Sequence, residues 1–291
     1  MSQYRYIVNE GGKTVFDYLS SFNLGKEKIK YYRLNNSIFI NGEKKPIDTK
    51  LVKGDILVLE NKLDKLDVLP LAKKISILYE DEYLLIINKP TNIVVHSDGA
   101  ENINNTLVNA VAYYYKNKGL DIPVRYVHRL DKDTTGIIIF AKDPLTESYL
   151  SSKIEERLLH RDYLALVSGS IKKDLVINKP IGRDRHINGK YRISETGKEA
   201  ITLVSVQKDY KKFSLVRLSL KTGRTHQIRV HLSSIGHPIL GDTLYGGSDN
   251  LIKRQALHSY YVTFKDIRGR DIEVYAKLPY DMERIVKLEK M

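Results

Sequence analysis

A polar stretch at residues 128–136, set between two apolar segments, constrains the fold more than any other part of the sequence. The run 136–140 that follows it is typical of a strand buried on both faces. A dense polar loop is not needed for folding alone, and loops held on a rigid sheet are where functional sites concentrate. Taken locally, the residues favour a simpler interpretation, a polar turn in which Asp131 and Asp133 cap loop amides.

Apolar runs of strand length alternate with segments of helical period along the chain, which indicates an α+β fold. A length of 291 residues suits two domains, and we expect a small module at 1–62, a charged linker at 63–75 and a large domain at 76–291. Expected strands lie at 4–8, 37–40, 56–60, 75–79, 83–87, 136–140, 161–167, 213–220, 256–264 and 271–276, and expected helices at 15–22, 26–33, 106–116 and 144–158.

The chain carries 48 basic and 35 acidic residues, a net charge of +13, which argues for a polyanionic partner rich in phosphates. A basic surface that only keeps the protein soluble would show the same excess. The absence of cysteine excludes disulfides, thiolate nucleophiles and Cys-ligated metal sites. No apolar run reaches membrane-spanning length and no signal peptide is evident, so we expect a cytoplasmic protein with no membrane partner, and a monomer.

The polar loop has the pattern of a known family. His128-Arg129-Leu130-Asp131, with Thr134-Thr135-Gly136 after it, resembles the signature loop of the RluA family of RNA pseudouridine synthases. The resemblance implies that Asp131 is the catalytic residue. It also implies RNA contacts from His128 and Arg129, with Arg129 filling the space that a flipped base leaves.

Three further segments resemble family motifs in the family's order. Asn88-Lys89-Pro90 with Val94-Val95-His96 resembles the first motif, and Arg161-Asp162-Tyr163 opens a strand that resembles the second. The block 222–232, followed by Gly236-His237-Pro238-Ile239-Leu240-Gly241-Asp242, resembles the third. By this resemblance Tyr163 lies against the flipped base and removes a late proton, Arg229 pairs with Asp131, and Lys89, Arg224 and His226 contact RNA.

The implied fold is a long, bent, mainly antiparallel mixed sheet with helices and a central cleft. The implied reaction is an isomerisation that moves the ribose–uracil bond from nitrogen to carbon and needs neither metal nor cofactor. Family members act on ribosomal RNA, for which the two-module layout argues, or on transfer RNA. Asp131 would act either as a nucleophile at the anomeric carbon or as a base at the neighbouring sugar proton.

The first 62 residues resemble the small RNA-binding module of ribosomal protein S-four, with two helices, a strand, the turn Asn41-Gly42 and a final strand. That resemblance implies phosphate contacts from the second helix, with Lys26 and Lys30 as candidates beside Lys28 and Arg33. A basic, glycine-punctuated segment at 180–200 fits an RNA-gripping hairpin and a mobile loop equally well.

Thr225 is expected to cap a helix that stops near Gly236. In that helix His226 and Arg229 lie side by side, whereas His226 and His231 are about 140° apart, which disfavours a shared metal. Three other functions stay open: a catalytically silent RNA-binding or ribosome-assembly factor, a metal-dependent hydrolase, and a two-carboxylate glycosidase.

Overall fold

The structure is a computed structural model and describes residues 2–97, 104–210 and 212–288. A ten-stranded mixed sheet forms its main body, and the strands β8 and β15 at its centre run parallel while the other paired strands run antiparallel. The α+β prediction is confirmed. The strands are β5 (Ser76–Glu80), β6 (Leu84–Lys89), β7 (Arg125–Tyr126), β8 (Thr135–Ala141), β9 (His160–Ser168), β10 (Leu175–Asn178), β13 (Ile201–Asp209), β14 (Phe213–Leu220), β15 (Leu257–Lys265) and β16 (Asp271–Tyr275).

The main sheet has the order β10-β13-β14-β9-β15-β8-β6-β5, with β16 paired to β15 and β7 to β8. Strand alternation sends successive side chains to opposite faces, and each face packs into its own core. On β6, Leu85 and Ile87 join one core while Leu84 and Ile86 join the other. Both faces of the central strands are therefore buried, which explains why the run 136–140 is apolar at every position after Gly136.

In the described part of the chain, four helices and a 3-10 turn cover this sheet. Thr106 caps α3 in a reciprocal capping box with Asn109, and Asp143 caps α4 by accepting from two backbone amides. None of the helices in the described part of the chain has the length and apolar character to cross a membrane. The helices are α3 (Leu107–Asn117), α4 (Pro144–Glu155), α5 (Gln227–Ser234), α6 (Tyr280–Leu288) and the 3-10 turn Thr243–Tyr245.

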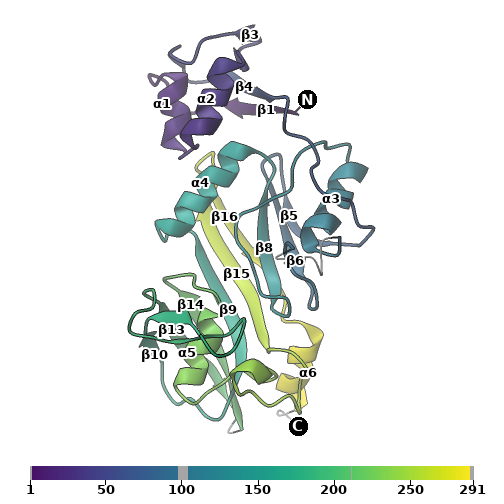
Figure 1. Ribbon diagram of the computed structural model, residues 1–291, viewed down its shortest axis with the longest axis vertical. Coiled ribbons are helices and arrows are strands. Elements are labelled where there is room, and N and C mark those ends of the chain that lie inside the picture. Colours follow the sequence, from purple (N-terminus) through teal and green to yellow (C-terminus); the bar gives the residue numbers. More distant parts are fainter. Residues whose placement is uncertain (1, 98–103, 211, 289–291) are drawn as a thin grey trace.

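Residues 2–61 form a separate four-stranded sheet with two helices, at one end of the long axis of the molecule (Figure 1). Thr14 caps the first helix by accepting from the Asp17 amide, as predicted. The predicted order of helices and strands is confirmed, with boundaries that shift by one or two residues. The elements are β1 (Ser2–Ile7), α1 (Val15–Ser21), α2 (Lys26–Leu34), β2 (Ile38–Ile40), β3 (Glu43–Lys44) and β4 (Ile56–Asn61).

The small sheet is firmly attached to the large one, because one core cluster contains residues of both. The Tyr6 hydroxyl donates to Asp143 Oδ1 over 2.6 Å, so the residue that caps α4 also binds the amino-terminal strand. Lys28 forms an ion pair with Glu147 of α4 at 3.1 Å. Residues 62–75 contain no helix or strand, yet they are fixed too, since the Leu71 amide donates to the Asn109 carbonyl.

Candidate active site

The loop that carries Asp131 is supported from behind by Lys89. The ammonium of Lys89 donates to the Lys132 carbonyl at 2.7 Å and to the Pro90 carbonyl at 2.9 Å. Its side chain is fully buried, and burial lowers its pKa to about 7 against the pull of Asp133 and Asp131. The prediction that Lys89 contacts RNA is therefore corrected: the residue lies beneath the loop, where it holds the backbone.

Gly136 allows the loop to join the sheet. Its φ of 111° lies in the region that favours glycine, and a Cβ there would stand 2.1 Å from the Ser259 carbonyl oxygen on β15. Any side chain at this position would push β8 away from β15, its parallel neighbour in the main sheet. The glycine at the end of the motif thus fixes the distance from the loop to the sheet.

Arg229 joins Asp131 to a second carboxylate. Its Nη1 donates to Asp131 Oδ2 at 3.1 Å, while Nε and Nη2 donate to Asp242 at 2.7 and 2.8 Å. Burial opposes the charge of this arginine, but hydrogen bonds and charge from Asp242 and Asp131 outweigh burial and raise its pKa. The guanidinium also lies 4.8 Å over the ring of Tyr245. Arg229 is thus a fixed cation beside Asp131, as predicted.

Asp242 is the partner that sequence reasoning missed. Its side chain is 1% exposed, and its two oxygens accept a two-point hydrogen bond from Arg229. The signal was present, because Asp242 ends the Gly-His-Pro-Ile-Leu-Gly-Asp segment of the third motif. No periodicity indicates that this carboxylate meets Arg229 thirteen residues earlier.

His226 approaches the same carboxylate from the start of α5. Its Nε2 lies 3.8 Å from Asp131 Oδ2, and its Nδ1 is 2.9 Å from the Tyr245 hydroxyl. Burial lowers the pKa of His226, and Asp131 opposes that shift. The predicted Thr225 cap is wrong: His226 occupies the cap position with φ 55°, and the Gln227 side chain closes the turn instead by accepting from the Arg224 amide. His226 and Arg229 nonetheless face the same acid.

Tyr163 lines a cavity of about 80 Å³ together with Asp131 and Arg229. The tyrosine is 5% exposed, and burial raises its pKa. The phenol is therefore protonated at neutral pH, and it forms part of the lining of the cavity. Its place beside Asp131 follows from the pairing of β9 with β15, which sets Tyr163 opposite Ser259.

The small cavity adjoins a cleft of about 970 Å³ whose wall is rich in basic residues. Arg129 is exposed there, with Nη1 3.2 Å from His96, and Arg224 is exposed with Nε bound to the Glu199 carbonyl. His128 is different. Its imidazole is 8% exposed and both ring nitrogens are shielded, without a hydrogen-bond partner among the described residues. His128 thus lines the cleft as a packed, nearly buried side chain, and its contact with RNA stays a prediction.

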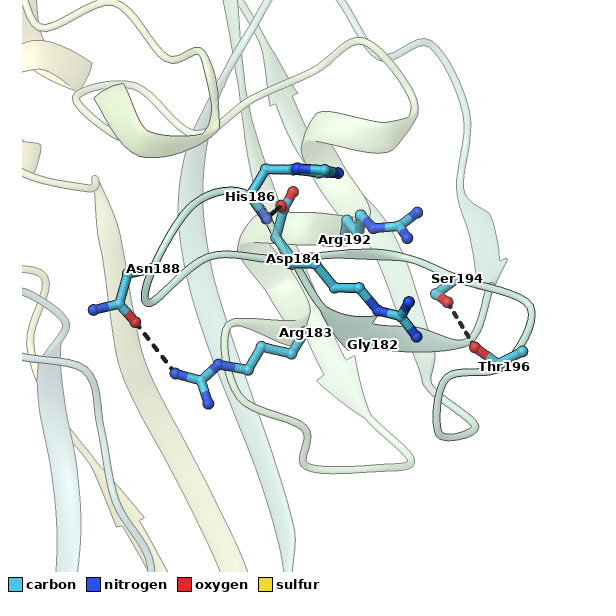
Figure 2. Close-up of a pocket in the computed structure, with 9 residues that line it drawn as sticks. Gly182, Arg183, Asp184, His186, Asn188, Arg192, Ser194 and Thr196 are labelled. Carbon is cyan, nitrogen blue, oxygen red and sulfur yellow. Dashed lines mark hydrogen bonds between the residues drawn. The ribbon is translucent and has the colours of Figure 1, made fainter.

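Two other basic regions lie away from Asp131. The hairpin of β11 (Ile181–Arg183) and β12 (Tyr191–Ile193) encloses a hollow of about 600 Å³ (Figure 2), and Tyr191 ties it to the site because its amide donates to the Tyr245 hydroxyl. On α2, Lys26 and Lys30 are exposed. Among residues 2–97, 104–210 and 212–288 there is no group of three or more His, Asp or Glu side chains placed to hold a metal.

The site thus combines one carboxylate, a fixed arginine and a buried tyrosine at the edge of a basic cleft. Residues 83–234 match the RNA pseudouridylate synthase family. The chain belongs to this family, and the RluA-type motifs agree with that membership.

Relatives match across nearly the whole chain. An uncharacterized RNA pseudouridine synthase of Bacillus subtilis is 38% identical, with 97% of this chain and 95% of the relative covered. The ribosomal large subunit pseudouridine synthase D of Vibrio cholerae is 34% identical, with 89% and 85% covered. Among solved structures, human RNA pseudouridylate synthase domain containing 1 is 26% identical, with a TM-score of 0.60 over 75% of this chain and 95% of that one. The protein is thus an isomerase that acts on RNA.

Proposed function

We propose that this protein converts specific uridines of large-subunit ribosomal RNA to pseudouridine in the cytoplasm. The single observation that carries the proposal is the Asp131–Arg229–Asp242 chain of hydrogen bonds beside Tyr163 at the edge of a basic cleft. Relatives named for the large ribosomal subunit, at 34 to 35% identity, support the choice of RNA.

In the reaction the bond between the ribose and the uracil nitrogen breaks, the base turns, and the ribose rejoins a ring carbon. That carbon then loses its proton, and the freed nitrogen takes up a proton. Asp131 works at the sugar, either as a nucleophile at the anomeric carbon or as a base at the neighbouring proton. Both roles need an ionised carboxylate held in one position. Arg229 supplies that position, because Asp242 fixes its guanidinium from the other side.

Tyr163 contacts the uracil. A uridine must leave its stack to reach the cavity, which costs a few kcal/mol, and the buried phenol offers an aromatic face at that place. Its raised pKa makes the ring contact the first role of Tyr163. If Tyr163 also removes the proton from the ring carbon, its phenol must first transfer its own proton to another group.

Contacts to the RNA backbone come from three places. Arg129 and Arg224 line the cleft, the β11–β12 hairpin offers further arginines, and Lys26 and Lys30 extend the basic surface onto the amino-terminal module, which would act as the S-four-like RNA-binding domain. Such contacts give affinity without reading sequence.

The test uses the full-length protein with two substrates, transcribed large-subunit ribosomal RNA and transcribed transfer RNAs, both tritiated at uridine carbon 5. We expect tritium release from the ribosomal RNA, and pseudouridines at the same positions that a gene-deletion strain lacks. Release from transfer RNA alone would move the substrate to that class. Binding without release from either RNA would make the protein a silent RNA-binding factor.

A further inference from the structure

Arg161 on β9 lines the cleft and opens the segment that resembles the second family motif, yet the reaction above gives it no role. It stands two residues before Tyr163, so strand alternation places both side chains on the same face, about 7 Å apart along the strand. Tyr163 lines the small cavity and Arg161 lines the wider cleft beside it. The guanidinium therefore lies in the cleft wall beside the small cavity.

Arg161 differs from the other shielded arginines because it has no acidic partner within the described residues. Its Nε is buried without a hydrogen bond, and no carboxylate of residues 2–97, 104–210 or 212–288 lies within ion-pair distance. Arg161 is half-buried, and its shielded Nε carries the cost of an unpaired buried donor, about 1–3 kcal/mol, that a carboxylate partner normally offsets. Arginines whose side chains are 8% exposed follow that rule here: Arg125 pairs with Asp64, Arg229 with Asp242 and Arg254 with Asp281.

The surroundings of Arg161 keep its charge available. His128, the titratable neighbour behind it, stays neutral, because burial and then the charge of Arg161 lower its pKa to about 3; the Arg129 backbone opposes that shift. Across the cleft wall, a Cβ on Gly223 would stand 3.3 Å from Arg161 Nη2, tight enough to press on the guanidinium. A glycine at 223 thus leaves room beside nitrogens that can only donate.

We propose that Arg161 binds a phosphate oxygen of the linkage next to the target uridine, in a subsite completed by the open backbone at Gly223. A phosphate fits better than a base edge, because Arg161 presents a positive charge and nitrogens that can only donate. The phosphate would be the anionic partner that Arg161 lacks within the described residues. The proposal rests on the proposed function, since it needs a flipped uridine beside Tyr163.

The first measurement compares Arg161→Met and Arg161→Lys with wild type on a synthetic stem–loop around a uridine that the wild-type protein converts. We expect Arg161→Met to raise KM by about tenfold to a hundredfold while kcat stays within about threefold, the loss of one charge-assisted hydrogen bond to substrate. Arg161→Lys should fall between the two. Lys265→Met, which removes an exposed lysine already paired with Asp271, is the matched control and should change neither constant.

The decisive measurement changes the RNA instead of the protein. One linkage at a time, 5′ or 3′ to the target, is replaced by an uncharged methylphosphonate. At one linkage we expect the methylphosphonate to weaken wild-type binding by as much as Arg161→Met weakens binding of unmodified RNA. The same methylphosphonate should not weaken binding by Arg161→Met any further, so the two changes are non-additive. Equal losses for both proteins at every linkage, or a fall in kcat alone, would overturn the phosphate contact. A wild-type protein that converts no uridine would instead overturn the proposed function.

Discussion

The Asp131 site and the β11–β12 hairpin are both rich in charge, but they arrange it in opposite ways. At the site, Asp131 binds Arg229, Arg229 binds Asp242, and Lys89 is fixed on two backbone carbonyls. On the hairpin, Arg185 and Arg192 have no ion pair in the described part of the chain, and Arg183 reaches only the Asn188 amide oxygen at 3.2 Å, as Figure 2 shows.

The difference follows from what each region has to do. A group that acts on a bond must hold its charge at a fixed position before substrate arrives, so the protein supplies its partners. A group that binds a polyanion receives its counter-charge from the RNA, and pairing it within the protein would compete with binding. Arg161 lies inside the cleft, yet it resembles the hairpin arginines in lacking an acidic partner.

The largest effect is expected from Asp131→Asn. The amide keeps the shape of the side chain but removes the charge, so product formation should fall by on the order of 10⁴-fold or more. RNA affinity should stay near that of wild type, because the cleft and hairpin arginines are untouched. Tritium release and a filter-binding titration measure the two quantities. Turnover within tenfold of wild type would remove Asp131 from the chemistry.

Asp242→Asn tests whether a paired arginine is needed for catalysis or only for folding. It removes the charged partner at the buried end of Arg229 and leaves only Asp131, whose side chain is 27% exposed. Breaking a buried pair of this kind costs about 3–5 kcal/mol of unfolding free energy. We expect kcat to fall by about a hundredfold as Arg229 loses its orientation, with KM little changed.

Asp266→Asn is the matched control for Asp242→Asn. Asp266 is also 1% exposed and also pairs with arginines, Arg268 and Arg270, but none of the three lines the cleft. It should lose comparable stability, measured by urea unfolding, and keep its kcat. Equal losses of kcat in both variants would make Asp242 a residue of the fold alone.

The sequence predicted elements and motifs well, but it predicted buried polar residues poorly. β14 occupies Phe213–Leu220 as expected, because its alternation is local information. Lys89 was placed at the surface although the same alternation sets it on one face with Leu85 and Ile87. We predicted an exposed position from the charge of Lys89 and gave no weight to its place in the strand. In the fold, two loop carbonyls accept hydrogen bonds from the buried ammonium and stabilise it.

The Arg229–Asp131 pair came from a resemblance, and its geometry agrees. The resemblance did not predict that Asp242 pairs with Arg229, or that ring nitrogens of His128 and the Nε of Arg161 lack a hydrogen bond. These features depend on which segments meet across the sheet. The Thr225 cap failed for a similar reason: a side chain further on, Gln227, satisfies the turn. Local propensity does not rank such competing partners.

A smaller effect is expected from the hairpin double variant Arg183→Met/Arg192→Met. If both arginines meet phosphates, the slope of log affinity against log salt should fall by about 1.4 to 1.8. KM should rise while kcat stays unchanged, since neither residue lines the cleft at Asp131. The control Lys253→Met/Lys265→Met removes two lysines that are already ion-paired and should leave the slope as it was. An unchanged slope in the hairpin variant would remove it from the RNA interface.

The smallest expected effect is on stability and concerns His128. Its imidazole is buried like the residues of the site, but like the hairpin arginines it has no acidic partner among the described residues. Its folded-state pKa is about 3, lowered first by burial, against 6.5 for an unperturbed imidazole, so the unfolded chain takes up a proton that the folded chain does not. Wild-type stability should therefore decline as pH falls from 6.5 toward 3, and His128→Phe should escape this decline. Relative to pH 7.5, the variant should gain about 1.4 kcal/mol over wild type at pH 5.5. Urea unfolding at both values measures the gain. Parallel losses in the two proteins would mean that His128 finds a partner on protonation, and that the environment behind Arg161 is less apolar than its missing hydrogen bonds indicate.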